Sequence, residues 1–300
     1  MKRKNLTAFL LTFAVISFII AAAFVGSGTD AQAALAYPLT MKDDLGRSVT
    51  LNAQPQRIIS LTPSVTEMLF ALEAGSRVVG VTNFCNYPAE ALNIAKIGDT
   101  NLNFERILEL QPDLIIGVGS MQAEDINKLV SLGQKVFVIE AVKIADIPRQ
   151  MRVLGRVLGN AGVGEKLATD FENGVAAIQK KVSQQKARPR VFIEIWNEPL
   201  MTAGPNTFMD ELIVMAGGSN IAGDSPNPWP QFSMETVIQR DPEVIILTCY
   251  NKAEVLKRKA WAGVSAIKNG RVFEINPDIY SRPAPRLIDA LGEMYGLLHP

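Results

Sequence analysis

The sequence predicts an α/β fold of two β/α lobes, each with a mainly parallel central sheet, joined by a single long helix. Three observations lead to this prediction. Short apolar runs alternate with helical patterns from residue 57 to residue 139, the alternation starts again at residue 190, and only helical patterns lie between. Such alternation is typical of parallel sheets with crossover helices, whose binding crevices lie at the carboxyl ends of the strands.

A repeated pattern supports two related lobes. Asn103–Gly117 (NFERILELQPDLIIG) is typical of a capped short helix, a proline and a buried strand, and Ser233–Leu247 (SMETVIQRDPEVIIL) repeats it. In both copies a cap residue precedes a glutamate by two positions, a proline follows the glutamate by seven, and an acid and an Ile-Ile pair come next. Glu105 and Glu235 therefore hold matching positions in the first turns of their helices, where the helix dipole favours an anion.

The first half is expected to contain a hairpin, three more strands and two more helices besides the repeat. These are the hairpin strands 37–41 and 47–51, the strands 57–61, 77–82 and 135–139, a helix that opens at residues 62–64 and runs to about 72, and a helix at 123–132. In the helix after Thr62, Glu67 is expected to act as the capping-box partner of Ser64.

The middle of the chain predicts the connector. Residues 144–158 and 164–185 have helical patterns, and the second has an apolar face made of Leu167, Phe171, Val175, Ile178 and Val182. A helix of that length spans about 33 Å, enough to cross between lobes. The predicted divisions are a signal peptide at 1–36, an N-terminal lobe at 37–160, a connecting helix at 161–187 and a C-terminal lobe at 188–300.

The second half repeats the β/α alternation. Outside the repeat, the expected elements are the strand 190–195, the helix 207–216, a charged helix at 253–259, the strand 272–275 and a terminal helix at 283–298.

Composition and the N-terminus indicate an exported protein. The 30 basic and 30 acidic residues balance, which argues against a nucleic-acid partner. Lys2–Lys4, a long apolar run and two Ala-x-Ala patterns at 31–36 are typical of a cleaved signal peptide, and thus of a periplasmic protein. The alternative is a retained membrane anchor formed by residues 6–25. Cys85 and Cys249 fall in different lobes and are expected to be separate thiols, a bridge between the lobes being the alternative.

The sequence contains no recognisable arrangement of catalytic residues. The one histidine, His299, lies next to the C-terminus, and neither a nucleophile-elbow nor a dinucleotide-binding motif occurs. An exported hydrolase or metal-dependent enzyme that uses carboxylates alone is the alternative. We therefore expect a binding protein, not an enzyme, with no catalytic residues, cofactor or metal site.

Candidate ligand-binding residues lie in loops after strands. Proline-stiffened aromatic rings offer flat apolar contact to a large planar ligand with little ordering cost. The candidates are Tyr87, Trp196, Trp229, Asp278, Tyr280 and Arg282. Asp278 and Arg282 could also simply pair with each other.

Several motifs together resemble the periplasmic substrate-binding proteins of ABC importers, in the class whose lobes are joined by one long helix. They are RIISLTPSVTEMLFALEAGSRVVGVTNFCNYP, the first repeat, TFMDELIVMAGGSNI and NPWPQFSMETVI. Within the class, the Asn-Tyr-Pro loop, the Trp-Asn-Glu-Pro-Leu loop and Pro-Trp-Pro-Gln most resemble cobalamin (vitamin B12)-binding members.

The resemblance implies a monomer that captures cobalamin or a related corrinoid and delivers it to a permease dimer. By this resemblance, Tyr87 and Trp229 match aromatic positions that contact the corrin, and Asp278 and Arg282 match polar positions near the ligand. Glu105 and Glu235 match the glutamates that dock onto arginines of the permease. Such proteins carry further aromatic residues near the positions of Asp99 and Val118, and this chain lacks them, so the resemblance does not fix which corrinoid is bound. Ferric siderophore or haem is the alternative ligand.

Overall fold

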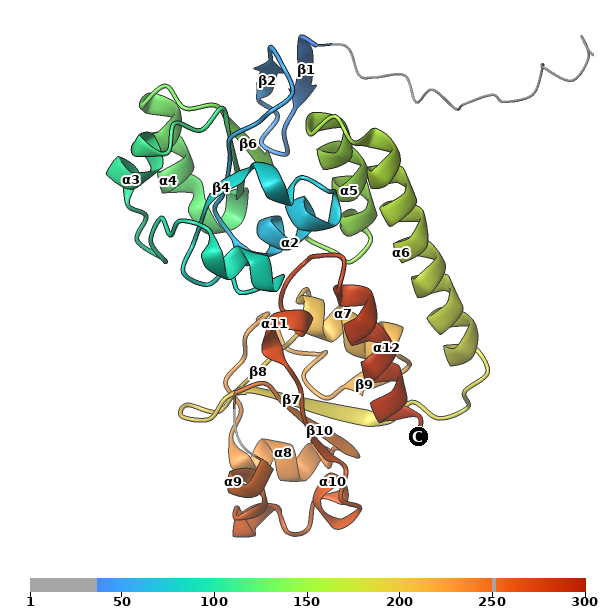
Figure 1. Cartoon of the computed structure of the whole chain (residues 1–300). Coiled ribbons are helices and arrows are strands. Elements are labelled where there is room, and N and C mark those ends of the chain that lie inside the picture. The colour runs from blue at the N-terminus through green and yellow to red at the C-terminus, as the bar shows by residue number, and fades with distance from the viewer. Residues whose placement is uncertain (1–36, 250–251) are drawn as a thin grey trace, which may run out of the picture. The chain divides into compact units, whose positions relative to one another are not determined.

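The computed structural model describes residues 37–249 and 252–300, and its two mainly parallel sheets confirm the predicted fold class (Figure 1). The N-terminal lobe, which holds β1–β6 and is called lobe 1 below, has a sheet with the strand order β4-β3-β5-β6 and all neighbours parallel; the C-terminal lobe, with β7–β11, is called lobe 2. The sheet of lobe 2 has the order β11-β10-β7-β8 with β9 also beside β7, and β8 is antiparallel to β7. The strands are β3 (Ile58–Ser60), β4 (Val78–Val81), β5 (Leu114–Val118), β6 (Val136–Ile139), β7 (Arg190–Trp196), β8 (Met201–Thr202), β9 (Ser219–Asn220), β10 (Val244–Leu247) and β11 (Val272–Glu274). The predicted hairpin is present as β1 (Leu39–Lys42) and β2 (Ser48–Leu51).

Helices connect most successive strands, and two more follow the last strand. They are α2 (Pro63–Ala71), α3 (Phe104–Glu109), α4 (Gly119–Ser131), α5 (Asp146–Val157), α6 (Ala161–Val182), α7 (Phe208–Met215), α8 (Met234–Arg240), α9 (Lys252–Leu256), α10 (Ser265–Lys268), α11 (Pro277–Tyr280) and α12 (Leu287–Leu298), with 3₁₀ turns at Gly75–Arg77, Ala89–Asn93 and Lys259–Trp261.

The central strands bury both faces, which is why they are continuous apolar runs. In β10, Val244 and Ile246 belong to one apolar cluster, whereas Ile245 and Leu247 belong to another. The cluster that contains Val244 extends through α6 into lobe 1, so the two lobes share one continuous apolar core.

The two copies of the repeat form the predicted capped helices. The Asn103 side-chain oxygen accepts a hydrogen bond from the N–H of Arg106 at 2.9 Å, and the Ser233 hydroxyl accepts one from Thr236 at 3.1 Å. Each cap satisfies a donor that the first turn would otherwise leave without a partner.

The acids of the repeat also match in structure. The Asp113 carboxylate accepts hydrogen bonds from the backbone N–H groups of Gln56 at 2.7 Å and Arg57 at 3.0 Å, just before β3. The Glu243 carboxylate accepts one from the backbone of Arg190 at 2.9 Å, at the start of β7. Each acid thus ties the start of its own strand to the start of the neighbouring one.

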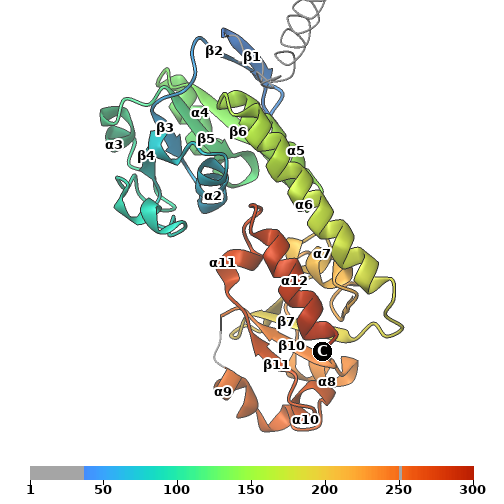
Figure 2. The same cartoon turned by 45° about the vertical axis from the view of Figure 1, so that its right-hand side comes forward.

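The long helix is α6, and it lies beside α5 in both views (Figures 1 and 2). Ala168, Phe171 and Ile178 are buried along it, and it also packs against α12 of lobe 2. A Cβ atom on Gly164 would lie 2.5 Å from the carbonyl oxygen of Met151, so this glycine is what allows α5 and α6 to approach closely. The division of the chain at residues 160 and 187 stays a prediction.

Three expectations about local structure were wrong. Glu67 does not cap α2; the Thr62 hydroxyl accepts from Val65, and Glu67 is buried. The terminal helix begins at Leu287, not residue 283, because the short helix α11 and a loop precede it. The helix α4 begins at Gly119, directly after β5, and is kinked at Gln122.

Cys85 is buried, Cys249 is exposed and both are free thiols, as expected. The predicted signal peptide lies outside the described residues. Within residues 37–249 and 252–300, the structure contains no helix with the length and apolar character needed to cross a membrane.

Candidate functional site

Three of the predicted aromatic residues are partly exposed, in loops or at the end of a strand. Tyr87 follows β4 and is 43% exposed, Trp196 ends β7 and is 52% exposed, and Trp229 precedes α8 and is 50% exposed. All three therefore keep accessible surface for contact with a ligand.

The loops around both tryptophans are anchored. The indole N–H of Trp196 donates to the carbonyl of Glu198 at 2.9 Å. On either side of Trp229, the carbonyl oxygens of Pro228 and Pro230 accept hydrogen bonds from backbone N–H groups of the strand β8 region, at 2.8 and 3.1 Å. Fixed loops reduce the conformational entropy that a ligand must remove on binding.

Asp278 and Arg282 form a polar cluster with residues of lobe 1. The two residues pair with each other at 2.7 Å. Arg282 also donates to the Glu67 carboxylate at 3.0 Å and to the Asn86 side-chain oxygen at 2.8 Å. The Asn86 amide in turn donates to Asp278 at 2.7 Å.

Arg286 completes this cluster. Its Nε and Nη2 donate to the two Glu67 oxygens at 2.8 and 2.6 Å, and its guanidinium lies over the Tyr87 ring, 3.5 Å from the centroid. The hydrogen bonds to Glu67 raise the pKa of Arg286 above its ordinary value, while burial opposes the rise. With Glu67 and Asp278 against Arg282 and Arg286, the formal charges of the cluster balance.

Tyr280 does not reach the ligand-binding loops in this structure. Its side chain is fully buried in the apolar core. Burial and the carboxylate of Glu293 raise the pKa of Tyr280 well above its ordinary value. The predicted role of Tyr280 in ligand contact is therefore corrected to a packing role.

Sequence reasoning missed Glu67, Asn86 and Arg286. Arg286 lies four residues beyond Arg282 in the loop between α11 and α12, and this spacing is a weak signal for a shared partner. Phe84 and Met121 are also exposed, after β4 and at the start of α4.

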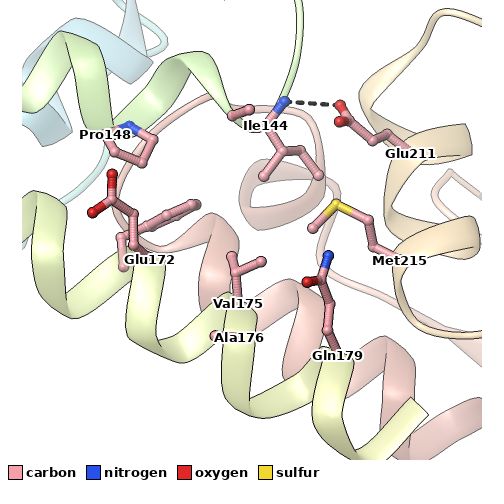
Figure 3. A pocket seen from close by; sticks show the side chains of 10 residues that line it. Ile144, Pro148, Glu172, Val175, Ala176, Gln179, Glu211 and Met215 are labelled. Carbon is pink, nitrogen blue, oxygen red and sulfur yellow. Dashed lines mark hydrogen bonds between the residues drawn. The ribbon is translucent and has the colours of Figure 1, made fainter. Parts of the chain in front are cut away.

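Three cavities lie elsewhere on the described part of the chain, two of them at α7 and one beside the loop that follows Trp196. One of about 440 Å³ is lined by α5, α6 and α7, and its wall includes the hydrogen bond from the N–H of Ile144 to Glu211, 2.8 Å long (Figure 3). A second of about 250 Å³ also touches Glu211, and a third of about 570 Å³ lies beside residues 197–200. None of these three is lined by a predicted ligand-binding residue.

The glutamates of the repeat are exposed. Glu105 lies in the first turn of α3 and Glu235 in the first turn of α8. Hydrogen bonds from its own backbone N–H and from the Ser233 hydroxyl lower the pKa of Glu235 below its ordinary value. Glu235 therefore keeps its negative charge at neutral and mildly acidic pH.

Comparison of the sequence and the structure with known proteins identifies a family and several similar proteins. The sequence model of the family described as periplasmic binding protein matches residues 58–279. The ABC transporter substrate-binding lipoprotein YvrC of Bacillus subtilis is 31% identical over 88% of this chain and 86% of its own length. A vitamin B12-binding protein of Salmonella choleraesuis is 35% identical over 83% of this chain and 92% of its own. The haem-binding protein RhuT of Roseiflexus sp. RS-1 has a similar structure, with a TM-score of 0.74 and 27% identity over 81% of this chain and 98% of its own.

Proposed function

Because the chain belongs to the periplasmic binding protein family, we propose that it captures cobalamin or a related corrinoid between its lobes and delivers it to an ABC importer. Members of this family are solute-binding proteins of ABC import, not enzymes, so the function of the chain is to bind and hand over a solute. The proposed ligand contacts are Tyr87, Trp196, Trp229, Asp278 and Arg282.

The observation that carries the choice of ligand is the charge balance of the polar cluster. The Arg282 guanidinium contacts Glu67, Asn86 and Asp278, so its charge is already compensated. An anionic ferric chelate would need an uncompensated cation, because a buried charge without a partner is costly. A wide ligand with an apolar face and neutral amide groups at its edge matches the partly exposed Tyr87 ring beside the hydrogen-bonding groups of this cluster.

The test is a titration of the purified protein with cyanocobalamin, followed by tryptophan fluorescence. Quenching that saturates at micromolar ligand or below is expected, and it should shrink in Trp196→Phe and Trp229→Phe. A flat trace at micromolar cyanocobalamin would contradict the proposal.

Haem is the second candidate, because a haem-binding protein is among the structural neighbours. Iron in haem commonly takes a tyrosine or histidine ligand. Here Tyr280 is buried, and the Tyr87 ring lies against Arg286. His299 follows the C-terminal end of α12, where its ring contacts the carbonyl oxygen of Ala216. Competition among cyanocobalamin, haem and a ferric catecholate measures the preference directly, and tighter binding of haem would assign the site to haem.

The exposed glutamates support a docking role. We propose that Glu105 and Glu235 contact basic residues of the permease dimer in the periplasm, since each occupies the matching position of a repeat. Paired negative charges of this kind favour electrostatic association with a two-fold partner. Export by the predicted cleavable signal peptide and a monomeric state belong to the same proposal.

A further inference from the structure

Glu67 is a buried carboxylate in lobe 1 whose hydrogen bonds come from lobe 2. Its residue is 4% exposed, and its two oxygens accept three hydrogen bonds from Arg282 and Arg286. The partners are more than 200 residues away along the chain, at separations of 215 and 219. A buried carboxylate requires such partners, so this contact is an obligatory link between the lobes.

The same carboxylate determines the orientation of Arg286. Two donors of one guanidinium, Nε and Nη2, reach the two oxygens of Glu67, which fixes the plane of the group. That plane lies over the ring of Tyr87, with 3.5 Å between the guanidinium carbon and the ring centroid. A guanidinium can stack in this way while donating in its own plane, which a lysine ammonium cannot do.

Tyr87 is left with part of its ring covered and part open. Arg286 lies over the ring, yet 43% of the residue stays exposed to solvent. A surface tyrosine without such a contact would sample several rotamers and would lose that freedom when a ligand stacks on it.

We infer that Arg286, oriented by Glu67, is a positioning residue that holds the Tyr87 ring ready for ligand stacking. This inference rests on the proposed function, because it assumes that the ligand contacts Tyr87. It makes Arg286 and Glu67 determinants of affinity although neither needs to touch the ligand.

A double-mutant cycle tests the inference with cyanocobalamin as the probe. Arg286→Met should weaken binding about tenfold, a coupling typical of residues in contact. In Tyr87→Ala the further change Arg286→Met should have little additional effect, because the ring on which Arg286 acts is absent. Additive losses in this pair would overturn the inference. The matched pair Arg286→Met with Trp229→Ala should be additive.

Two further variants separate positioning from folding. Arg286→Lys keeps the charge but not the planar group, so it should weaken binding nearly as much as Arg286→Met; wild-type affinity would overturn the inference. Arg152→Met removes a surface arginine that pairs with Glu165 and Glu172 on α6, and it should leave affinity unchanged.

A measurement without ligand distinguishes this inference from the proposed function. A ¹⁹F-labelled tyrosine at position 87 should give a resonance that shifts and broadens in Arg286→Met and Glu67→Gln but not in Arg152→Met. An unchanged resonance in the first two variants would overturn the positioning role. Failure of the wild type to bind cyanocobalamin, with these shifts present, would contradict the corrinoid assignment alone.

Discussion

The buried charges around Glu67 stabilise the molecule only as a complete set. The side chains of Glu67, Arg282 and Arg286 are 2%, 10% and 19% exposed, so little water can replace a missing partner. Removal of one member of such a set is typically far more costly than the loss of an exposed ion pair. The contact therefore holds α2 of lobe 1 to the α11–α12 segment of lobe 2.

Tyr280 provides a prediction about alkaline stability. Burial and the Glu293 carboxylate raise its pKa above the ordinary value of 10.0. Above about pH 10 the unfolded chain releases the phenol proton while the folded protein retains it, so the free energy of unfolding should fall by about 1.4 kcal/mol per pH unit from this group. Below pH 10 its contribution is fully present.

Tyr280→Phe should remove this part of the pH dependence. Urea unfolding of both proteins between about pH 8 and pH 11 measures it as the difference between the two slopes. Equal slopes for wild type and variant would show that the phenol ionises as readily in the folded protein as in the unfolded chain.

At the residue scale, local chemistry was predictable and long-range partners were not. The aromatic residues Tyr87 and Trp229 could be assigned to open loops because prolines adjoin them. Glu67 was assigned to a capping box because its spacing from Ser64 fits one, whereas its partner Arg286 lies 219 residues away. Tyr280 stands next to a predicted loop in sequence, but only the packing of α11 against α12 shows that it is buried.

Among the elements, the two copies of the repeat share more local structure than their sequence pattern predicted. Both copies have a non-glycine residue with positive φ directly before the proline, Gln111 at 45° and Asp241 at 40°. Both then use the following acid to bind the backbone at the start of the neighbouring strand. The cap, the turn and the acid are thus explained by the fold, and the glutamate in the first turn is left for another role.

The packing of α5 on α6 gives a second prediction. A methyl group at Gly164 would lie 2.5 Å from the carbonyl oxygen of Met151 and 3.0 Å from Gly155, both backbone atoms that cannot move aside without separating the helices. Gly164→Ala should therefore destabilise the protein by about 1–3 kcal/mol, in spite of the higher helix propensity of alanine.

Gly296→Ala is the matched control. This glycine lies in α12, and a methyl group there would meet nothing within 4 Å. The same substitution should then stabilise the protein by about 0.5–1 kcal/mol. Denaturant unfolding of both variants checks the pair, and a stable Gly164→Ala protein would contradict the close approach of α5 and α6.

For the whole molecule, the connecting helix was predictable because its apolar stripe has a helical period over 22 residues. The stripe predicted Phe171 and Ile178 at the buried face, and both are buried. It did not predict that Gly164 and Gly174 mark the contacts with α5 and α12, since a glycine carries no hydropathy signal. The continuous core along this helix joins the two sheets of the described residues, so large hinge motion between them would disturb apolar packing.

With little hinge motion between the sheets, the distance between surface residues of the two lobes stays nearly constant for a partner. Glu105 and Glu235 are exposed, occupy matching positions in the two lobes and have no role in the core. The double variant Glu105→Lys, Glu235→Lys should lower uptake of radiolabelled cyanocobalamin by about tenfold or more in cells with the cognate importer, because attraction to the permease becomes repulsion. Its affinity for the ligand should stay that of the wild type.

The double variant Glu109→Lys, Glu254→Lys is the control. It changes the charge by the same amount at other exposed positions, on α3 and α9, and should transport normally. If the Glu105→Lys, Glu235→Lys variant takes up cyanocobalamin as well as the control variant and the wild type, the docking role is wrong and the two glutamates only stabilise the starts of their helices.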